Sequence, residues 1–416
     1  MSDLIAKLRA ATPPAVMEVC RTLTDAGHEA VAVGGAIRDV LLDRVAGDWD
    51  VGTSARPDAV IALFRRTIPT GLQHGTVTVM AGRGDDRLGI EVTTYRGEGA
   101  YEDGRRPTSV QFGVPLVEDL ARRDLVVNAI AFDPVRGVLH DPFDGQGDLA
   151  ARRLRAVGDA TERFTEDGLR VMRAIRFAAT LGFALDAATE AAIPAALPSL
   201  AKVSRERVKI ELDKLLGAAR PGPSLEIARR VGVLAQAVPE AAADGPEWPA
   251  RVAWIDAAPV DARLALLLLG GPELTDAARA SSVEQAMRRL KAANDERERA
   301  VRIARVARAA APDEIAVRRR LAGAGRALAP LVVAIWRARD PLGGSLATTA
   351  EIILARGDAL AASDLALTGA GLIAALGLPP GPAIGRGLAA CLEAVLDDPA
   401  RNTPDALVAI ARTALA

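Results

Sequence analysis

Short runs rich in β-branched residues mark the first 150 residues of the chain. They lie at 31–35, 49–53, 76–80, 89–95 and 125–133. Turns separate these runs, and two stretches with helical spacing of apolar residues, 14–26 and 56–66, lie among them. Strand and helix patterns that alternate along a chain are typical of an α/β or α+β domain. We therefore expect residues 1–150 to form an α/β head.

Strand patterns nearly vanish after residue 151. Segments rich in Ala, Leu and Arg follow with helical spacing, and they predict an elongated, all-helical remainder. Gly and Pro interrupt these segments near 218–223, 238–249, 311–312 and 377–382. We expect a neck at 151–216, a body at 217–310 and a tail at 311–416.

Two helical stretches of the remainder and one loop of the head have a distinct pattern. Residues 204–216 predict an amphipathic helix that braces the neck. Residues 283–308 carry eight Lys and Arg among Asp and Glu, which is typical either of an ion-paired exposed helix or of a surface that follows RNA phosphates. The glycine-rich polar segment 96–113 separates two strand-like runs, and a loop of this length is usually functional or disordered.

The charge, the cysteine content and the apolar runs of the chain limit which classes of protein it can belong to. The 416 residues include 52 Lys and Arg against 53 Asp and Glu, a net charge of −1, so any nucleic-acid surface must be local. The two cysteines, Cys20 and Cys391, predict buried thiols without a disulfide partner. The N-terminus lacks the pattern of a signal peptide and no apolar run reaches bilayer length, so we expect a cytoplasmic protein without a membrane partner.

A pair of glycines follows the first strand-like run. Gly34 and Gly35 come directly after Val31–Val33 and begin a helical stretch that carries Arg38. Two glycines at a strand-to-helix turn allow the backbone to approach a phosphate, and Arg38 would face the same anion. A Gly-Gly pair taken alone is more often only a tight turn.

Acidic residues enter two of the expected strands. Asp48 and Asp50 are two residues apart and would point to the same face, where a divalent ion would neutralise their repulsion. Glu91 begins another alternating run and would add a third carboxylate to a two-metal site. The alternatives are a solvated acidic turn for the pair and an edge-strand surface charge for Glu91.

A third cluster combines cations, an acid and an amide. Arg122, Arg123, Asp124 and Asn128 surround the apolar residues Leu125–Val127. Arg123 and Asn128 suit the oxygens of a triphosphate. Without the other motifs, this cluster would be interpreted as a helix start with an ion pair.

Five ordered motifs give the chain a family resemblance. These are GGAIRDVLL, GDWDVGTSA, RRDLVVNAIAFDP, DPFDGQGDLAARRLRAVG and the segment around EDGLRVMRAIRFAATLGF. In this order they resemble the tRNA nucleotidyltransferase and bacterial poly(A) polymerase family, class II of the polymerase-β-like superfamily. The resemblance covers roughly residues 25–215. It implies a polymerase-β-like head with a mixed sheet, followed by a helical neck, body and tail.

The resemblance also implies roles for individual residues. Gly35 and Arg38 would contact the nucleotide, Asp48 and Asp50 would hold the metals, and Arg123 would bind the triphosphate. A set of neck residues would read the nucleotide base: Asp167, Arg170, Arg173 and Arg176. Residues 142–147 would link head and neck.

The neck residues have a chemistry that suits base selection. Asp167 and the three arginines follow one another at intervals of three, which predicts one face of a helix. Such a stripe is usually a solvated face. A carboxylate beside a guanidinium matches the donor and acceptor edges of cytosine and adenine, whereas uracil and guanine reverse that pattern. We therefore expect Asp167 and Arg170 to accept CTP and ATP and to reject UTP and GTP.

The function implied by the resemblance is Mg²⁺-dependent addition of C, C and A to the 3′ end of tRNA, without a nucleic-acid template. Asp48, Asp50 and Glu91 would be catalytic, and CTP, ATP and tRNA would be the substrates. The alternatives are a poly(A) polymerase, an enzyme that adds only CC or only A, and a non-catalytic RNA-binding relative. The segment 377–386 resembles a C-terminal segment of many family members, which would dock RNA, or it is a simple turn between helices.

Overall fold

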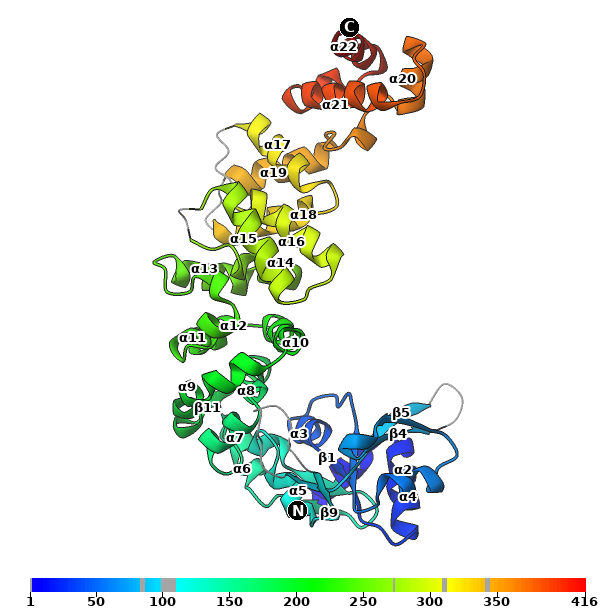
Figure 1. The fold of residues 1–416 in the computed structure, drawn as a ribbon, viewed down its shortest axis with the longest axis vertical. Coiled ribbons are helices and arrows are strands. Elements are labelled where there is room, and N and C mark those ends of the chain that lie inside the picture. The colour runs from blue at the N-terminus through cyan, green and yellow to red at the C-terminus, as the bar shows by residue number, and fades with distance from the viewer. Residues whose placement is uncertain (1, 83–86, 99–109, 272–273, 309–312, 341–344) are drawn as a thin grey trace. The chain divides into compact units, whose positions relative to one another are not determined.

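The computed structural model describes residues 2–82, 87–98, 110–271, 274–308, 313–340 and 345–416. The chain forms two compact units, Met1–Ala237 and Val238–Ala416 (Figure 1). The greater part of the polar loop expected at 96–113, residues 99–109, lies outside the described residues. The four-part division into head, neck, body and tail stays a prediction.

The first part of the first unit alternates helices and strands. Its elements are α1 Ser2–Ala11, α2 Pro14–Asp25, β1 Ala30–Val33, α3 Gly35–Leu41, β2 Asp50–Thr53, α4 Pro57–Leu63, β3 Thr67–Gly71, β4 Thr76–Ala81, β5 Leu88–Thr94, β6 Arg96–Glu98, β7 Val110–Phe112, α5 Leu116–Ala121, β8 Ala131–Asp133, β9 Val138–His140 and α6 Gly145–Ala150.

Seven of these strands form one mixed sheet in the order β3-β4-β5-β2-β1-β8-β9. Strand β2 pairs parallel with β5, and the other neighbours in the sheet pair antiparallel. Helices α2 and α4 pack against strands of this sheet (Figure 1). Val31 and Val33 of β1 are buried in a core that includes Leu120 of α5. The expected α/β head with a mixed sheet is confirmed.

The strand expected over 125–133 is wrong in its first half. Val126–Asn128 is a short 3₁₀ helix, and β8 begins only at Ala131. The carboxylate of Asp124 accepts hydrogen bonds from the backbone N–H of Leu125 and from the side chain of Asn128. Local side-chain bonds of this kind compete with strand pairing and favour a turn.

The rest of the first unit is mostly helical. Its elements are β10 Arg153–Leu154, α7 Ala160–Glu166, α8 Leu169–Leu181, β11 Ala184–Leu185, α9 Ala187–Lys202, α10 Arg205–Leu216, α11 Gly222–Arg230 and α12 Val233–Ala237. Helix α8 packs against α10 and α11, and α7 packs against α9. The amphipathic helix expected at 204–216 is present as α10.

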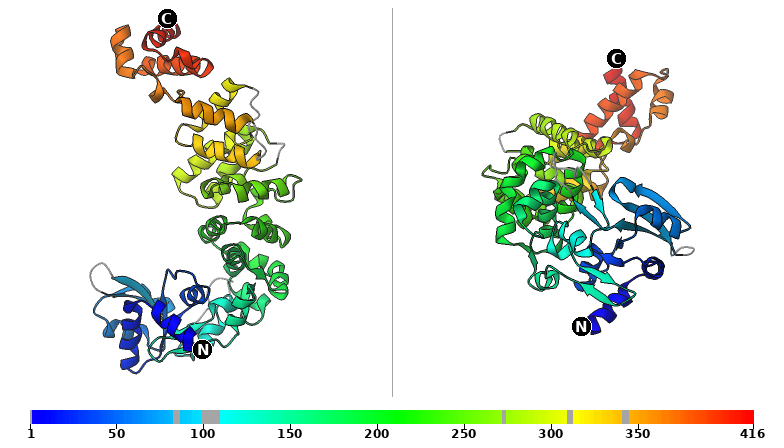
Figure 2. Two further views of the ribbon diagram at one scale, coloured as in Figure 1. Left: turned by 180° about the vertical axis from the view of Figure 1, so that it is seen from behind. Right: turned by 60° about the horizontal axis from the view of Figure 1, so that its bottom comes forward.

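The described part of the second unit contains helices and no strand (Figure 2). Its α-helices are α13 Trp248–Ala257, α14 Val260–Leu267, α15 Asp276–Arg289, α16 Asn294–Val306, α17 Glu314–Ala324, α18 Ala329–Arg339, α19 Ser345–Arg356, α20 Gly369–Leu376, α21 Pro382–Asp397 and α22 Pro404–Leu415. Among the described helices, none is both long and apolar enough to span a bilayer. The helical remainder expected from the sequence is confirmed.

The single helix suggested by the basic stretch 283–308 is wrong. The stretch spans two helices, α15 and α16, which pack against each other. Lys291, between them, has a φ of 58°, a left-handed conformation that ends a helix. The segment 377–386 is a turn that leads into α21, with Gly377 in the left-handed region.

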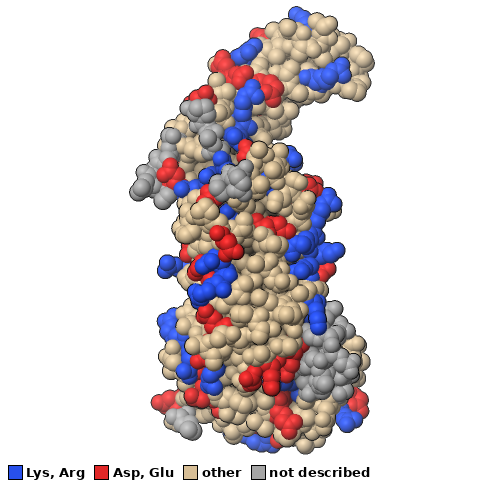
Figure 3. Space-filling model, turned by 60° about the vertical axis from the view of Figure 1, so that its left-hand side comes forward, with Lys and Arg blue, Asp and Glu red and all other residues tan. Residues whose placement is uncertain are grey.

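The charged side chains of the surface are mixed in sign. Over the face shown in Figure 3, Lys and Arg alternate with Asp and Glu. This mixture agrees with the net charge of −1. Cys20 and Cys391 are both free and buried.

Candidate active site

The turn after β1 depends on a glycine. Gly34 has a φ of 81°, and a Cβ atom at this position would lie 2.9 Å from Nη1 of Arg123. The left-handed backbone and the close arginine both favour glycine here. Gly35 then begins α3, so the two glycines form the expected strand-to-helix turn.

Arg38 of α3 lies in the wall of the same cleft, where neighbouring side chains hold it in place. Its Nε and Nη2 atoms donate to Asp39 at 2.9 and 2.8 Å, and its Nη1 donates to Oδ1 of Asn128 at 2.6 Å. The guanidinium also lies 5.0 Å from the ring centre of Phe177. Arg38 and Asn128, both expected to contact a nucleotide, are therefore bound to each other in this structure.

The carboxylates gather where β2 begins. Asp48 precedes the strand, Asp50 is its first residue, and Glu91 of β5 lies directly opposite Asp50 in the parallel pair. Asp50 keeps contact with solvent, but the protein that crowds its carboxylate removes part of its hydration. This loss of hydration and the charges of Glu91 and Asp48 outweigh Arg123 and raise the pKa of Asp50 to about 6.

The raised pKa of Asp50 predicts how pH acts on the metal-free protein. An Asp carboxyl has a pKa of about 3.9 in the unfolded chain, so it holds its proton more tightly when folded, and the folded state loses stability as the pH rises from about 4 to about 6. Asp50→Asn removes this ionisation. In urea unfolding with EDTA present, we expect the variant to be more stable than wild type near neutral pH and equal to it near pH 4. Equal stability at both pH values would contradict the prediction.

Two arginines enter the cleft from the end of α5. The buried carboxylate of Asp119 accepts a hydrogen bond from Nε of Arg122 at 3.0 Å and lies 3.6 Å from Nη2 of Arg123. Nε of Arg123 is buried and has no hydrogen-bond partner in the described structure. Burial lowers the pKa of Arg123, although Asp119 and Asp50 oppose this effect. A buried cation with an unsatisfied donor suits an anionic ligand such as a phosphate.

The predicted helical stripe is wrong at its first member. Asp167 lies in the turn between α7 and α8, with φ −137° and ψ 104°, whereas the three arginines lie on α8. The next residue is Gly168, where a Cβ atom would lie 2.2 Å from the backbone nitrogen of Leu200. The end of α9 therefore approaches the chain too closely for any residue except glycine, and the helix pattern is interrupted there.

An ion pair joins helix α8 to the turn that follows α5. Nε of Arg173 donates to Oδ2 of Asp124 at 2.6 Å. Burial opposes ionisation of Asp124, but Arg173 and the hydrogen bonds from Asn128 and the Leu125 amide outweigh it and hold the pKa of Asp124 below its usual range. Asp124 is thus committed to Arg173.

Two predicted residues of the cleft have charged partners far along the chain, and of these the sequence indicated only that Glu211 could form an ion pair. Oδ2 of Asp167 accepts a hydrogen bond from Nη2 of Arg207 at 2.9 Å. Nε of Arg176 donates to Oε2 of buried Glu211 at 2.5 Å, and its guanidinium lies 3.8 Å from the ring centre of Phe177. Only the last contact joins residues that are neighbours in the sequence. The other two span 40 and 35 residues, and no sequence pattern indicates them.

Arg170 is held between neck and head. Its Nη1 binds Glu166 and the backbone oxygen of Arg163, and its Nη2 donates to the backbone oxygen of Arg122 at 3.0 Å. Glu166 is the last residue of α7 and Arg170 lies in the first turn of α8, so this contact bridges the turn between the two helices. The network fixes the guanidinium next to Asp167.

These residues line one cleft of about 620 Å³ within the first unit. The sequence predicted the following members of its wall: Gly35, Arg38, Asp48, Asp50, Arg123, Asn128, Asp167, Arg170, Arg173 and Arg176. Glu91 lies opposite Asp50 but is not part of the wall.

The acidic side chains of the cleft suit only part of a metal coordination shell. In the ranges that the structure describes, no three His, Cys, Asp or Glu side chains are arranged to hold a metal ion. Asp48 and Asp50 would therefore share the ion with water or with ligand oxygens. This is how proteins commonly bind Mg²⁺, through one or two carboxylates and the phosphates of a substrate.

Three family models match consecutive parts of the chain. Residues 30–155 match the poly A polymerase head domain. Residues 182–244 match the RNA and SrmB-binding site of polymerase A, and residues 273–411 match tRNA nucleotidyltransferase domain 2.

Individual proteins are similar over half or nearly all of the chain. The CCA-adding enzyme of Geobacillus thermodenitrificans is 47% identical over 235 residues, which make up 56% of this chain and 56% of that enzyme. The CCA-adding enzyme of Leuconostoc mesenteroides is 48% identical over 51% of this chain and 52% of that enzyme. The chain therefore spans about half the length of the curated relatives it matches. The crystal structure of the Bacillus stearothermophilus CCA-adding enzyme in complex with CTP is 32% identical, covers 97% of this chain and 98% of its own, and has a TM-score of 0.75.

Proposed function

Because the chain belongs to the family of tRNA nucleotidyltransferases and bacterial poly(A) polymerases, we propose that it adds C, C and A to the 3′ end of tRNA in the cytoplasm. The observation that carries the proposal is the cleft of the first unit. Its wall contains both Asp48 and Asp50 from the sheet and the charged residues of α8. A nucleotide bound there would have its phosphates beside the carboxylates and its base beside the neck. The solved relative from Bacillus stearothermophilus was crystallised with CTP.

The head residues suit a bound triphosphate. The Gly34-Gly35 turn and Arg123 would hold the phosphate oxygens, since Arg123 has a buried donor without a partner. Arg38 and Asn128 would mainly hold the wall of the site in place, because their side chains are hydrogen-bonded to each other. The 3′-hydroxyl of the RNA would attack the α-phosphate, and pyrophosphate would leave toward Arg123.

Asp48 and Asp50 would hold the divalent metal that nucleotidyltransferases of this family use, and we propose Mg²⁺. A bound ion of this kind promotes ionisation of the attacking hydroxyl and neutralises charge on the phosphates. Loss of hydration and, after it, repulsion by Glu91 and Asp48 raise the pKa of Asp50, and this supports the assignment because a cation between the carboxylates would relieve the repulsion. Glu91 would act through its charge on Asp50.

Asp167 and Arg170 would read the base. The Asp167 carboxylate already accepts bonds from Arg207 and from the Leu169 amide, and these bonds fix its direction while leaving acceptor capacity. Cytosine and adenine can donate to this carboxylate and accept from Arg170. Uracil and guanine present the opposite pattern and would leave buried polar groups unpaired.

Asp167→Ala therefore tests base selection. We expect the preference of CTP and ATP over UTP and GTP to fall by about 10- to 100-fold, since one good pair of base contacts gives about 1–3 kcal/mol of discrimination. Single-nucleotide incorporation assays with each of the four triphosphates measure this preference. Glu206→Ala, which removes an exposed carboxylate outside the cleft, should leave it unchanged. Unchanged selectivity in Asp167→Ala would contradict the assignment.

We place the tRNA phosphates on the second unit. Arg299, Arg302 and Arg305 of α16 are exposed, and no ion pair joins them to described residues. Neighbouring basic residues are less available, because Arg288 pairs with Glu284 and Arg289 with Glu240. Unpaired arginines at intervals of three can follow an RNA backbone.

Addition of nucleotides to a tRNA transcript that lacks its CCA end tests the function. With Mg²⁺, CTP and ATP, we expect three added nucleotides, with A added only when CTP is present. A long run of A on arbitrary RNA would instead assign the protein as a poly(A) polymerase, whose head domain matches residues 30–155. Addition of only CC or only A would identify a partial enzyme. No incorporation would favour a non-catalytic RNA-binding protein.

A further inference from the structure

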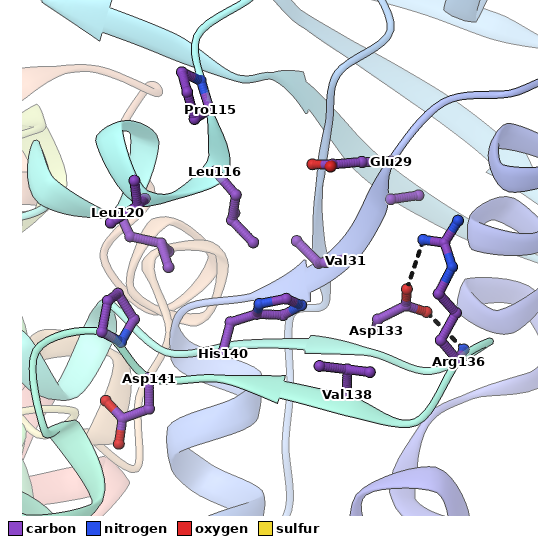
Figure 4. A pocket seen from close by; sticks show the side chains of 13 residues that line it. Glu29, Val31, Pro115, Leu116, Leu120, Asp133, Arg136, Val138, His140 and Asp141 are labelled. Carbon is purple, nitrogen blue, oxygen red and sulfur yellow. Dashed lines mark hydrogen bonds and ion pairs between the residues drawn. The ribbon is translucent and has the colours of Figure 1, made fainter.

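A second cavity lies in the head, apart from the cleft described above. Its volume is about 570 Å³, and its wall shares no residue with that cleft. Leu116, Val117 and Leu120 of α5 line one side, and Val31 of β1 and Val138 of β9 line the other (Figure 4). A volume of this size is typical of pockets that hold small molecules.

Much of the cavity wall is apolar and open to solvent. Val117 and Val138, which line the hollow, are 48% and 43% exposed. Pro115 and Pro142 extend the same apolar surface. Leu120 closes the cavity from within and is completely buried. The hollow therefore offers contact to the apolar part of a ligand.

Of the acidic side chains in the cavity wall, Glu29 has no partner among the described residues. The Glu29 side chain extends toward Leu116 (Figure 4), is exposed, and makes no hydrogen bond or ion pair with the described residues. The other carboxylates of the wall are already bound. Asp133 accepts from Arg136 at 3.1 Å and from two backbone amides at 2.9 Å, and Asp141 accepts from the backbone amides of Gly145 and Gln146. The charge that is left over in the cavity is negative.

The core behind the cavity contains a buried donor. Tyr95 is 1% exposed, and its hydroxyl has no hydrogen-bond partner in the described structure. Burial raises the pKa of Tyr95, and the charges of Glu29, Asp119 and Asp133 raise it further. Two of these three acids line the cavity. The ring of Tyr95 belongs to the core cluster that contains Val31 and Leu120.

We propose that this cavity binds a small organic cation with an apolar body, such as an arylalkylammonium ion. The ammonium group would pair with Glu29, and the body would lie between α5 and β9. A free carboxylate at the side of an apolar hollow favours a cation over an anion or a neutral molecule of the same shape. His140 also lines the cavity, and its ring would offer the ligand a second polar contact besides Glu29.

Helix α5 connects this cavity with the nucleotide cleft. It has only six residues, and its C-terminal end leads directly into Arg122 and Arg123, whose backbone N–H groups donate to Glu118 and Leu120. Asp119 on the same helix binds both arginine side chains. A ligand that moves Leu116 and Leu120 therefore also displaces the two arginines. This coupling rests on the proposed function, but the binding of the cation does not.

Titration with phenethylammonium chloride by isothermal calorimetry tests the site, with 2-phenylethanol as the neutral analogue. We expect saturable binding of the cation and weaker binding of the alcohol. Glu29→Gln should weaken cation binding about fivefold, the upper range for an exposed ion pair. Val138→Lys should weaken it further by repulsion. Glu18→Gln and Val45→Lys make the same changes at exposed positions outside the cavity and should have no effect.

Several outcomes would overturn the proposal. These are the absence of saturable binding, equal binding of the alcohol, and unchanged affinity in both Glu29→Gln and Val138→Lys. Competition by ATP without any effect of Glu29→Gln would place the cation in the nucleotide cleft instead.

The coupling is tested by measuring ATP affinity with and without the cation. We expect the two ligands to change each other's affinity by the same factor, as linkage requires. Binding of the cation with no change in ATP affinity would refute the coupling alone. If the protein binds the cation but does not bind ATP, the proposed cation site is supported and the proposed function is refuted.

Discussion

Replacing Asp48 or Asp50 with alanine is expected to reduce nucleotide addition by at least about 10²- to 10³-fold, the loss typical of removing one charged or polar group that stabilises a transition state. Both carboxylates line the cleft at the point where β2 begins, and among the described residues no group of three His, Cys, Asp or Glu side chains is arranged to hold a metal ion in their place. Incorporation of labelled CTP into a tRNA that lacks its CCA end measures the loss.

Stability measurements separate this effect from unfolding. Loss of hydration, followed by the charges of Glu91 and Asp48, raises the pKa of Asp50, so removal of this carboxylate should not destabilise the folded chain. We expect the Asp50→Ala variant to unfold at or above the urea concentration that unfolds wild type. Asp58→Ala, which removes an exposed carboxylate on α4 away from the cleft, serves as the control and should keep full activity. Substantial activity in either cleft variant would contradict the metal assignment.

The largest expected loss of stability comes from Gly168→Ala. The added Cβ atom would lie 2.2 Å from the nitrogen of Leu200 and 2.3 Å from the carbonyl carbon of Ser199. These are backbone atoms of α9, and they cannot rotate out of the way as a side chain can. We expect a loss of about 3 kcal/mol in the free energy of unfolding, the upper end for overpacking a close contact. Urea unfolding followed by circular dichroism measures it.

The same variant should also disturb base selection. Gly168 lies between Asp167 and α8, so displacing it would move the carboxylate away from Arg207 and Arg170. Gly385→Ala is the matched control. Gly385 lies within α21 with nothing within 4 Å of an added Cβ, and alanine there should stabilise the helix by up to about 1 kcal/mol. If the Gly168→Ala protein is as stable as wild type, the prediction is wrong, and the backbone of α9 can move away from the added Cβ atom at little cost.

The location of the cleft could be predicted from the sequence because its parts are local. The Gly34-Gly35 turn follows the apolar run Val31–Val33, and the Asp48 and Asp50 pair enters the next strand-like run, so both are visible in the chain. Backbone preferences act over a few residues, so such turns form where the sequence places them. The predicted roles of these residues stay predictions.

Strands β3 and β9 and the turn before α8 were not predicted, the strands because their sequences lack a clear pattern of apolar and polar residues. Strand β3 has the sequence Thr-Ile-Pro-Thr-Gly and no buried residue, and β9 has three residues at the edge of the sheet. Neither has the apolar face that makes a strand visible in a sequence. The break in the helix before α8 was not predicted, because Asp167 lies three residues before Arg170 and so fits the spacing of the arginines on α8. The break is caused by the close approach of the backbone of Leu200 to Gly168, which the sequence does not show.

The sequence by itself determined the chemical groups of this protein, their order, and the α/β head that precedes a helical remainder. Only the tertiary structure decided which of those groups are already neutralised. Asp124 pairs with Arg173 across 49 residues, Asp167 with Arg207 across 40, and Arg176 with Glu211 across 35. Local preferences depend on neighbouring residues, whereas a pair between distant residues forms only where packing brings two helices or a helix and a turn together. The sequence therefore determines which charged groups the cleft contains, and the fold determines which of them are paired with each other.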